Sequence, residues 1–368
     1  MMLRREFDTS ILLLSVVLTC LGVVMVYSAS SIMAGKKFAD GFYFLKRQGI
    51  FAVAGLMIMA FAMQIDYRHY RKVAALGLLI SIVLLVLVLI PGVGKHIGGA
   101  ARWIRLPGLS LQPSEVVKFA LVVYLAHSIS KKGERIREFA YGFLPYLLIM
   151  VLLVGLLLLQ PDLGGALTLS AVLLVMVSIA GARLRYLFML AALAMPALYF
   201  LVMNVDYRRK RILAFLNPWE DPSNTGFQII QSWIAFGSGG LAGNGLGESK
   251  QKLFYLPEAH TDFIFSVLGE ELGFIGVFVV TAMFLLLIAR GMKTALACPD
   301  HFGRYLAFGI SLLLGMEAFV NIAVVMGMLP TKGLALPFLS YGGTSLLTTL
   351  FAVGVLLNIS SQVPEVSR

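Results

Sequence analysis

Asp262 is the residue in this chain that is best placed for acid–base chemistry. It follows His260 and Thr261, where the longest polar stretch, residues 205–262, runs into an apolar segment. A carboxylate held at a partly desolvated rim that water can reach has its pKa raised toward neutrality, and it can then act as a general base. The alternative is structural: Thr261 or Asp262 would cap the following helix, and His260 would be a hydrogen-bonding residue rather than a second titrating group.

A second set of polar residues surrounds the start of another apolar run. Glu115 and Lys118 are three residues apart, so they share one face of the helix that Pro113 begins, with Ser114 expected as its cap. Ionisable residues inside a membrane span usually face a cavity or each other. The two side chains therefore form either a structural ion pair or part of the lining of a polar cavity.

Three further candidates lie in loops or turns. Arg102 stands beside Trp103, where its guanidinium would clamp a phosphate or the pair would anchor the chain at a membrane interface. Asp162 lies in the turn that Pro161 marks, where it either binds substrate or caps the next helix. Each of these positions keeps both interpretations open on sequence grounds.

Lys332 and Ser340 belong to residues 330–345, a segment with two prolines and three glycines. This composition predicts shaped, non-helical backbone, which is tolerated at membrane depth only when it is buried in protein or lines a cavity. Both residues are therefore candidates for substrate binding. Taken one at a time, the basic residues of the loops read equally well as solvated charges. As a set they indicate an anionic ligand, because clustered cations attract phosphate.

The elements that must position these residues are membrane spans. Hydrophobic residues make up 59% of the 368 and charged residues 13%, against about a quarter charged in soluble domains. The apolar runs are about 17–25 residues long, as a membrane-crossing helix requires. The sequence therefore predicts an all-α integral membrane protein with about ten transmembrane helices: 11–33, 48–64, 73–91, 114–129, 141–159, 163–181, 186–204, 263–289, 304–327 and 342–360.

We expect a single membrane domain over residues 1–368, with 205–262 as a large extracytoplasmic loop between helices seven and eight. An even number of spans places both termini on one side of the membrane. The short loops on that side carry basic residues such as Arg71, Lys132 and Arg183, so the positive-inside rule makes that side cytoplasmic. The outer loops hold nearly as many basic residues, which is why the assignment depends on the short loops.

Several classes of function are disfavoured. The sequence has no phosphate-binding glycine-rich loop, no paired-cysteine metal spacing and no nucleophile elbow, so an ATP-driven transporter or a zinc enzyme is not expected. Spans interrupt the basic charge, so nucleic acid is not expected as a partner. A lipid flippase or transporter and a non-catalytic scaffold remain as rivals to an enzyme. A transporter would use intramembrane carboxylates such as Glu270, Glu271 and Glu317, whereas the other motifs gather at the outer face.

Taken in order along nearly the whole chain, the motifs resemble those of the SEDS family, the shape, elongation, division and sporulation proteins of bacteria. They are residues 101–104 with 112–115, 160–164, 217–222, 256–265 with 269–273, and 336–345. Ala259 and residues 330–333 look more like the cell-division branch than the elongation branch, and the sporulation branch stays open.

The resemblance implies a ten-helix fold and peptidoglycan glycosyltransferase activity that polymerises lipid II at the outer face of the bacterial cytoplasmic membrane. It also implies as partners a class B penicillin-binding protein transpeptidase, other division proteins and membrane lipids. The family's essential aspartate maps onto Asp262, and its acidic and basic pair maps onto Glu115 and Lys118.

Our hypothesis joins both lines of reasoning. Asp262 removes the proton from the acceptor's 4-hydroxyl, and that oxygen displaces polyprenyl diphosphate from the donor sugar. The leaving group's charge requires electrostatic stabilisation, which Arg102, Lys118, Lys332 or a divalent cation (Mg or Mn) would supply; no organic cofactor is expected. The substrate-binding residues are expected to be Arg102, Trp103, Glu115, Lys118, Asp162, His260, Lys332 and Ser340.

Overall fold

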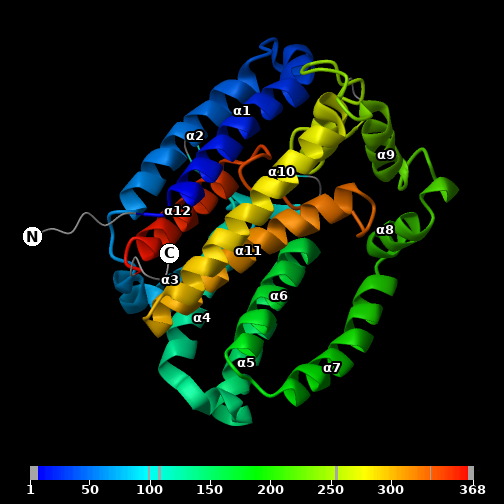
Figure 1. The fold of residues 1–368 in the computed structure, drawn as a ribbon. Helices are drawn as coiled ribbons and strands as arrows, with labels where there is room; N and C mark the ends of the chain where they lie inside the picture. The colour runs from blue at the N-terminus through cyan, green and yellow to red at the C-terminus, as the bar shows by residue number, and fades with distance from the viewer. Residues whose placement is uncertain (1–6, 98–99, 107–108, 253–255, 332, 364–368) are drawn as a thin grey trace, which may run out of the picture.

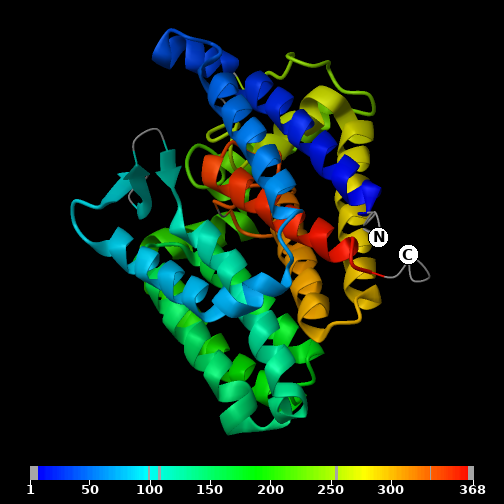
Figure 2. The same ribbon diagram turned by 90° about the vertical axis from the view of Figure 1, so that its left-hand side faces the viewer.

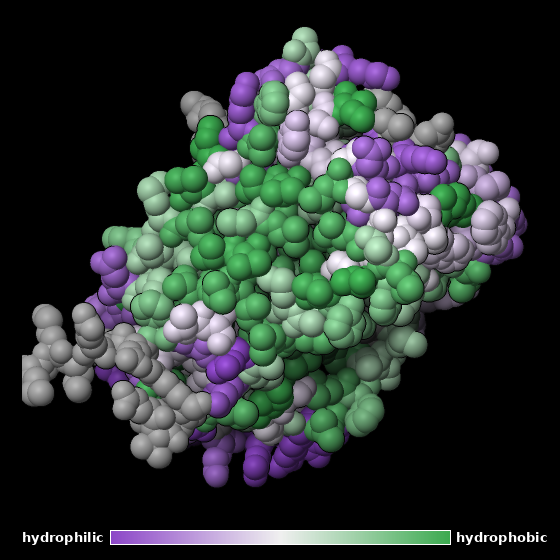
Figure 3. All heavy atoms as spheres, turned by 45° about the horizontal axis from the view of Figure 1, so that its top comes forward, coloured by the Kyte–Doolittle hydropathy of each residue, from purple (hydrophilic) through white to green (hydrophobic). Residues whose placement is uncertain are grey.

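The structure, a computed structural model, is a helical bundle with a broad apolar belt. It describes residues 7–97, 100–106, 109–252, 256–331 and 333–363. Within them, seven helical segments are long and apolar enough to cross a membrane: α1 (Thr9–Phe38), α2 (Tyr43–Ala62), α3 (Arg68–Leu89), Phe139–Leu159, which ends in α5 (Leu144–Leu159), α10 (Ile264–Ala297), α11 (His301–Val325) and α12 (Gly343–Ser360). A wide hydrophobic band crosses the face shown in Figure 3, and hydrophilic residues gather toward its ends. This surface suits a bilayer.

The other predicted helices are also present. They are α4 (Pro113–Lys132), α6 (Leu163–Ile179) and α7 (Leu184–Met203). Each of the ten predicted segments therefore coincides with a helix, and the predicted all-α membrane class is confirmed. Because α4 carries charged side chains and α6 is short, the exact number of spans stays a prediction.

Shorter elements were not anticipated from hydropathy. An antiparallel sheet of order β1-β2-β3 precedes α4, with strands Gly94–Ile97, Ala100–Leu106 and Leu109–Leu111. The long polar stretch contains α8 (Asp206–Leu216) and α9 (Phe227–Gly239), which lie together to one side of the bundle in Figure 1. The loop is therefore partly helical.

Helix α10 is divided by Gly273. This residue has φ 66° and ψ −166°, outside helical geometry, and only glycine adopts such a left-handed conformation without strain. A side chain here would also meet the backbone nitrogen of Gly243 at 2.3 Å. The chain at Gly240 and Leu241 accepts hydrogen bonds from Phe274 and Ile275. The predicted span 263–289 thus contains a short first helix before the long one, which continues to Ala297.

The helices that open and close the chain pack against each other. Helix α12 packs on α2 and α1, and α11 packs on α10, α4 and α6. Small residues permit the close approach: a Cβ on Gly55 would lie 2.5 Å from Leu350 Cδ1, and one on Gly354 would lie 2.5 Å from the Met59 carbonyl. Figure 2 shows α12 beside α1 and α2, with the start of α1 near the end of α12. The Asp8 amide donates to Ser360 Oγ at 3.0 Å, which joins the two ends.

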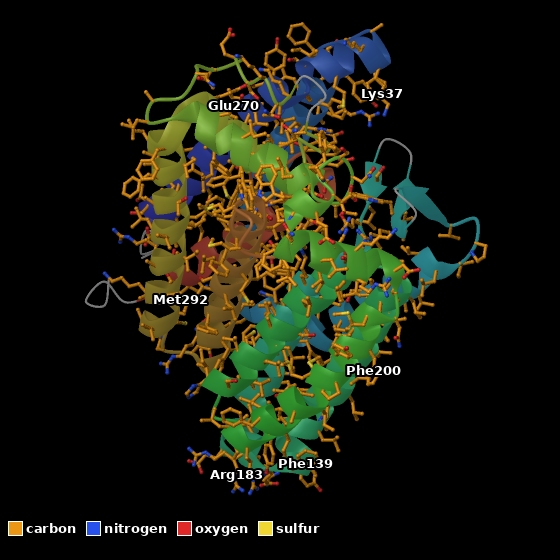
Figure 4. The ribbon with its side chains drawn as sticks, turned by 90° about the vertical axis from the view of Figure 1, so that its right-hand side faces the viewer. Lys37, Phe139, Arg183, Phe200, Glu270 and Met292 are labelled. Carbon is orange, nitrogen blue, oxygen red and sulfur yellow. The ribbon has the colours of Figure 1, made fainter. Side chains whose placement is uncertain are left out.

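The C-terminal end of α1, near Lys37 and Phe38, marks what we call the loop end of the bundle. Figure 4 shows Lys37 and Glu270 there, far from Arg183 and Phe139. The loop end also holds residues 240–252, which fold over the first part of α10: the amides of Asn244 and Gly245 donate to the carbonyls of Glu270 and Glu271. It is also the end at which α10 begins, directly after Asp262 and Phe263.

Candidate active site around Asp262

Asp262 lies in a turn just before α10. The helix begins at Ile264, its N-cap residue is Phe263, and no side chain caps it. The interpretation of Thr261 or Asp262 as the helix cap is therefore wrong. The Asp262 carboxylate instead faces Gly333, where an added Cβ would lie 3.2 Å from its Oδ2 and 4.0 Å from Nη1 of Arg102. A carboxylate and a guanidinium thus border the same small gap.

The surroundings of Asp262 favour its protonated form more than water would. The side chain is partly buried, and this burial, assisted by the negative charge of Glu258, raises its pKa to about 7. The positive charges of Arg211 and Arg102 oppose the rise. A carboxyl group with a pKa near the working pH can both accept and release a proton, which is what a general base requires.

Two arginines reach this region from separate elements. Arg102, on β2, donates through Nε to the Gln160 carbonyl at 3.2 Å and through Nη2 to the Pro161 carbonyl. Arg211, on α8, donates through Nη1 to the Thr331 carbonyl at 3.0 Å. Guanidinium groups held in this way suit phosphate oxygens. Sequence reasoning did not single out Arg211, and its signal was the basic run of residues 208–211.

Asp162 has a structural role at the start of α6. Its side chain accepts a hydrogen bond from the Gly165 amide at 3.0 Å and is almost fully buried. The capping interpretation is therefore confirmed. The same turn supplies the two carbonyls that hold Arg102, while Trp103 follows on β2 and is partly exposed. Binding of substrate by Asp162 or Trp103 stays a prediction.

His260 and Ser340 connect the turn of Asp262 to residues 336–341. The His260 ring packs 4.7 Å from Phe44 and 5.8 Å from Tyr341, and burial lowers the pKa of His260. Ser340 Oγ donates to the Thr261 carbonyl at 2.6 Å and accepts from the Leu336 amide at 2.8 Å. Both side chains thus support the local fold. Lys332 lies outside the residues that the structure describes.

Glu115 and Lys118 form the expected pair, with a third member. Lys118 Nζ lies 2.8 Å from Glu115 and also contacts Glu317 on α11, and all three side chains are largely buried. A small cavity beside them is lined in part by Thr348 and Thr349. The ion-pair interpretation is therefore confirmed, and the binding of substrate by Glu115 or Lys118 stays a prediction. The expected cap Ser114 is wrong: α4 starts at Pro113 and has no side-chain cap.

Glu270 and Glu271 bind residues 249–252 and α1 to the first part of α10, and these contacts occupy the carboxylates that a transport pathway would use. Glu270 accepts hydrogen bonds from Ser249 Oγ and from the Lys250 amide at 3.0 Å. Glu271 accepts from Ser28 of α1 at 2.6 Å and pairs with Lys252 at 2.9 Å, with both charged groups buried. These contacts satisfy two buried carboxylates locally, and they bind residues 249–252 to α10.

Fold and site together define a multi-span helical membrane protein with a basic, carboxylate-bearing site at its loop end. The chain belongs to the FtsW, RodA and SpoVE family, whose description is "Cell cycle protein"; the match covers residues 8–365. Over 359 residues it is 62% identical to a protein of Geobacter metallireducens named probable peptidoglycan glycosyltransferase FtsW, covering 98% of this chain and 96% of that one. It is 46% identical over 353 residues to stage V sporulation protein E of Bacillus subtilis, with 96% of each chain covered.

Solved structures share the fold. A chain of a peptidoglycan synthase complex, from work on the coordination of polymerization and crosslinking, superposes with a TM-score of 0.81 at 34% identity, covering 98% of this chain and 99% of that one. The rod shape determining protein RodA of Thermus thermophilus superposes with a TM-score of 0.71 at 31% identity, covering 96% and 97%. The predicted family is confirmed, with high identity to relatives named FtsW.

Proposed function

We propose that this protein is a peptidoglycan glycosyltransferase that polymerises lipid II, with Asp262 as its general base. The observation that carries the proposal is the partly buried Asp262 carboxyl, whose pKa is raised to about 7 beside Arg102 and Arg211. Relatives of high identity bear the name of this activity. A carboxyl that exchanges its proton near neutral pH next to fixed cations suits the transfer of a sugar from a diphosphate.

The reaction that we propose is a glycosyl transfer with Asp262 as the base. Asp262 accepts the proton of the 4-hydroxyl of the acceptor's N-acetylglucosamine as that oxygen bonds to the anomeric carbon of the donor's N-acetylmuramic acid. The bond from that carbon to the diphosphate oxygen breaks, and polyprenyl diphosphate leaves with the electron pair. In-line attack converts the α-linked phosphate into a β-glycosidic linkage. The proton then passes from Asp262 to solvent.

The cations act on the leaving group. Arg102 is held by two carbonyls and Arg211 by one, so neither has to reorganise when diphosphate charge develops. We assign the same role to Lys332. The buried Lys118 is already paired with two carboxylates, so its role is to shape the cavity rather than to meet the diphosphate.

A divalent cation fits this site only if a protein carboxylate and the substrate's phosphates bind it together. Among the described residues, no group of three or more His, Cys, Asp or Glu side chains is placed to hold a metal ion. Mg²⁺, however, is usually bound by one or two carboxylates together with waters and substrate phosphates. Glu258, an exposed carboxylate of the turn before α10, would hold it together with the substrate's diphosphate, and Asp262 would stay free to act as the base. When bound, it would neutralise diphosphate charge.

The proposal extends to the protein's setting. We infer that it lies in the bacterial cytoplasmic membrane with both termini cytoplasmic and acts in cell division. A class B penicillin-binding protein would cross-link the glycan that it makes. Support comes from relatives named FtsW, the cell-division branch of the family, and from the likeness to a chain of a synthase complex that joins polymerization and crosslinking.

The test uses purified full-length protein and lipid II. Asp262→Asn keeps the shape of the side chain but removes its proton-accepting charge, so glycan synthesis should fall by at least ~10²–10⁴-fold. Asp206→Asn is the matched control, because Asp206 is in the same loop and 83% of its side chain is exposed. Glycan at wild-type levels from Asp262→Asn would show that the base is another residue. No glycan from the wild-type protein, together with lipid II movement across vesicles, would favour the flippase.

A further inference from the structure

The turn that contains Asp262 has three successive backbone carbonyls, and each accepts a hydrogen bond from a different donor. The Tyr341 amide donates to His260 O at 3.0 Å, Ser340 Oγ donates to Thr261 O at 2.6 Å, and Asn321 Nδ2 donates to Asp262 O at 3.0 Å. Two of the donors lie in the segment that precedes α12, and the third is on α11. The turn is therefore held along its whole length by residues far away in sequence.

Asn321 also holds the opposite wall of the site. Its Nδ2 donates a second hydrogen bond to Leu334 O at 2.6 Å, next to the Gly333 that faces the Asp262 carboxylate. Because both partners are carbonyl oxygens, only the amide nitrogen can face them, which fixes the orientation of the side chain. One buried side chain thus sets the spacing between the two segments.

The side chain serves as a donor alone. Asn321 is 2% exposed, yet its Oδ1 has no hydrogen-bond partner within the described residues. A buried acceptor without a partner costs free energy. Its presence here is explained if the two bonds from Nδ2 provide something that an apolar side chain cannot.

We propose that Asn321 and Ser340 are positioning residues for the reaction: their hydrogen bonds fix the Asp262 carboxylate against Gly333 and Arg102 and keep water away from it. This inference rests on the proposed function of Asp262. Neither residue needs to touch substrate. A displacement of a catalytic group by about 1 Å can cost ~10²-fold in rate, so two donors that fix a turn can matter as much as a contact.

Burial and the charges around Asp262 determine in which direction its pKa should move in the variants. Glu258, from the same turn, raises its pKa, and Arg211 and Arg102 lower it, while burial is the largest cause of the rise. The nearby His260 has its own pKa lowered by burial, so it is neutral above neutral pH. Loss of the hydrogen bonds from Asn321 or Ser340 would admit water to the Asp262 carboxylate. Burial would then raise its pKa less. The pKa of Asp262 then falls toward its ordinary range.

The experiment measures lipid II polymerisation by purified Asn321→Ala and Ser340→Ala between pH 5 and 9. In the wild-type protein the rate should rise through about pH 7 as Asp262 loses its proton. In each variant we expect kcat to fall by ~10–100-fold, KM to change by less than about threefold, and the rising limb to move to lower pH. Ser340→Thr retains the hydroxyl and should restore much of the rate.

Asn358 provides a matched control for the loss of a buried asparagine. It is 4% exposed, its Nδ2 donates to Met63 O at 2.8 Å, and its Oδ1 accepts from the Tyr67 amide at 2.9 Å, near the chain ends. Asn358→Ala should lower thermal stability but leave the pH limb in place. If Asn321→Ala and Ser340→Ala only scale the rate equally at every pH, or leave it unchanged, the inference is wrong. Activity of the wild-type protein and its loss in Asp262→Asn would still stand.

Discussion

At the scale of single residues, the burial that suits Asp262 to act as a base also lowers the stability of the folded protein. Asp262 would be more stable in water, because burial opposes its charge and raises its pKa from 3.8 to about 7. In the window between these two values the folded protein binds a proton that the unfolded chain releases. Its stability therefore declines as the pH rises through that window.

Asp262→Asn should remove this decline in stability with pH. Asparagine has no charge to desolvate, so the variant should unfold at a higher temperature than the wild type, and by a clearly larger margin at pH 8 than at pH 5. A difference of a few degrees is expected for a domain of this size. Thermal unfolding in detergent at both values of pH measures it. A Tm difference that does not change with pH would mean that Asp262 titrates normally.

Gly333→Ala tests the gap between Asp262 and Arg102. The new Cβ would lie 3.2 Å from Asp262 Oδ2, closer than ordinary van der Waals contact, so the carboxylate must shift. We expect polymerisation to fall by about tenfold or more with little change in Tm. Gly342→Ala is the control in the same segment, because its Cβ would meet only Ser345 Cβ at 3.6 Å. Equal activity of both variants would mean that the gap tolerates a methyl group.

At the scale of elements, hydropathy and local chemistry predict different things. Long apolar runs revealed the ten helices because each is recognised from its own residues, and the cap Asp162 was visible beside its turn. Helices α8 and α9 and the small sheet were missed because each is too short to cross a membrane. Asn321 and Gly333 were missed because their partners lie far away in sequence, and sequence spacing says nothing about such contacts.

The pair of Glu271 and Lys252 should hold the loop end on α10. Removing one partner of a buried ion pair leaves an uncompensated charge and costs ~3–5 kcal/mol. Glu271→Gln should therefore lower Tm by several degrees, whereas Glu248→Gln, at an exposed position of the same loop, should not. Adding Lys252→Met to Glu271→Gln should recover part of the loss. A neutral Glu271→Gln would mean that the loop is fastened by other contacts.

At the scale of the whole molecule, the position of the site depends on how the bundle sits in the membrane. Lys37 and Glu270 mark the loop end, away from Arg183 (Figure 4). If the loop end is extracytoplasmic, the Asp262 site faces the side on which a cell wall is built.

Labelling measures this orientation. Cysteine introduced at the exposed Asn224 should react with an impermeant reagent added to intact cells, whereas cysteine at the exposed Lys131 should react only after the cells are opened. The parent protein, in which Cys20 of α1 is exposed and Cys298 is buried, provides the background. Reaction of both positions from outside would reject the proposed orientation.

The close contact between Gly55 of α2 and Leu350 of α12 has a consequence for biosynthesis. The two residues are separated by nearly 300 positions, and a ribosome adding about 5–20 residues per second needs roughly 15–60 s to bridge them. Throughout that time the face of α2 centred on Gly55 can meet only lipid or a helper protein in the insertion machinery. The first hairpin must therefore wait in the membrane, unfinished, until the last helix arrives.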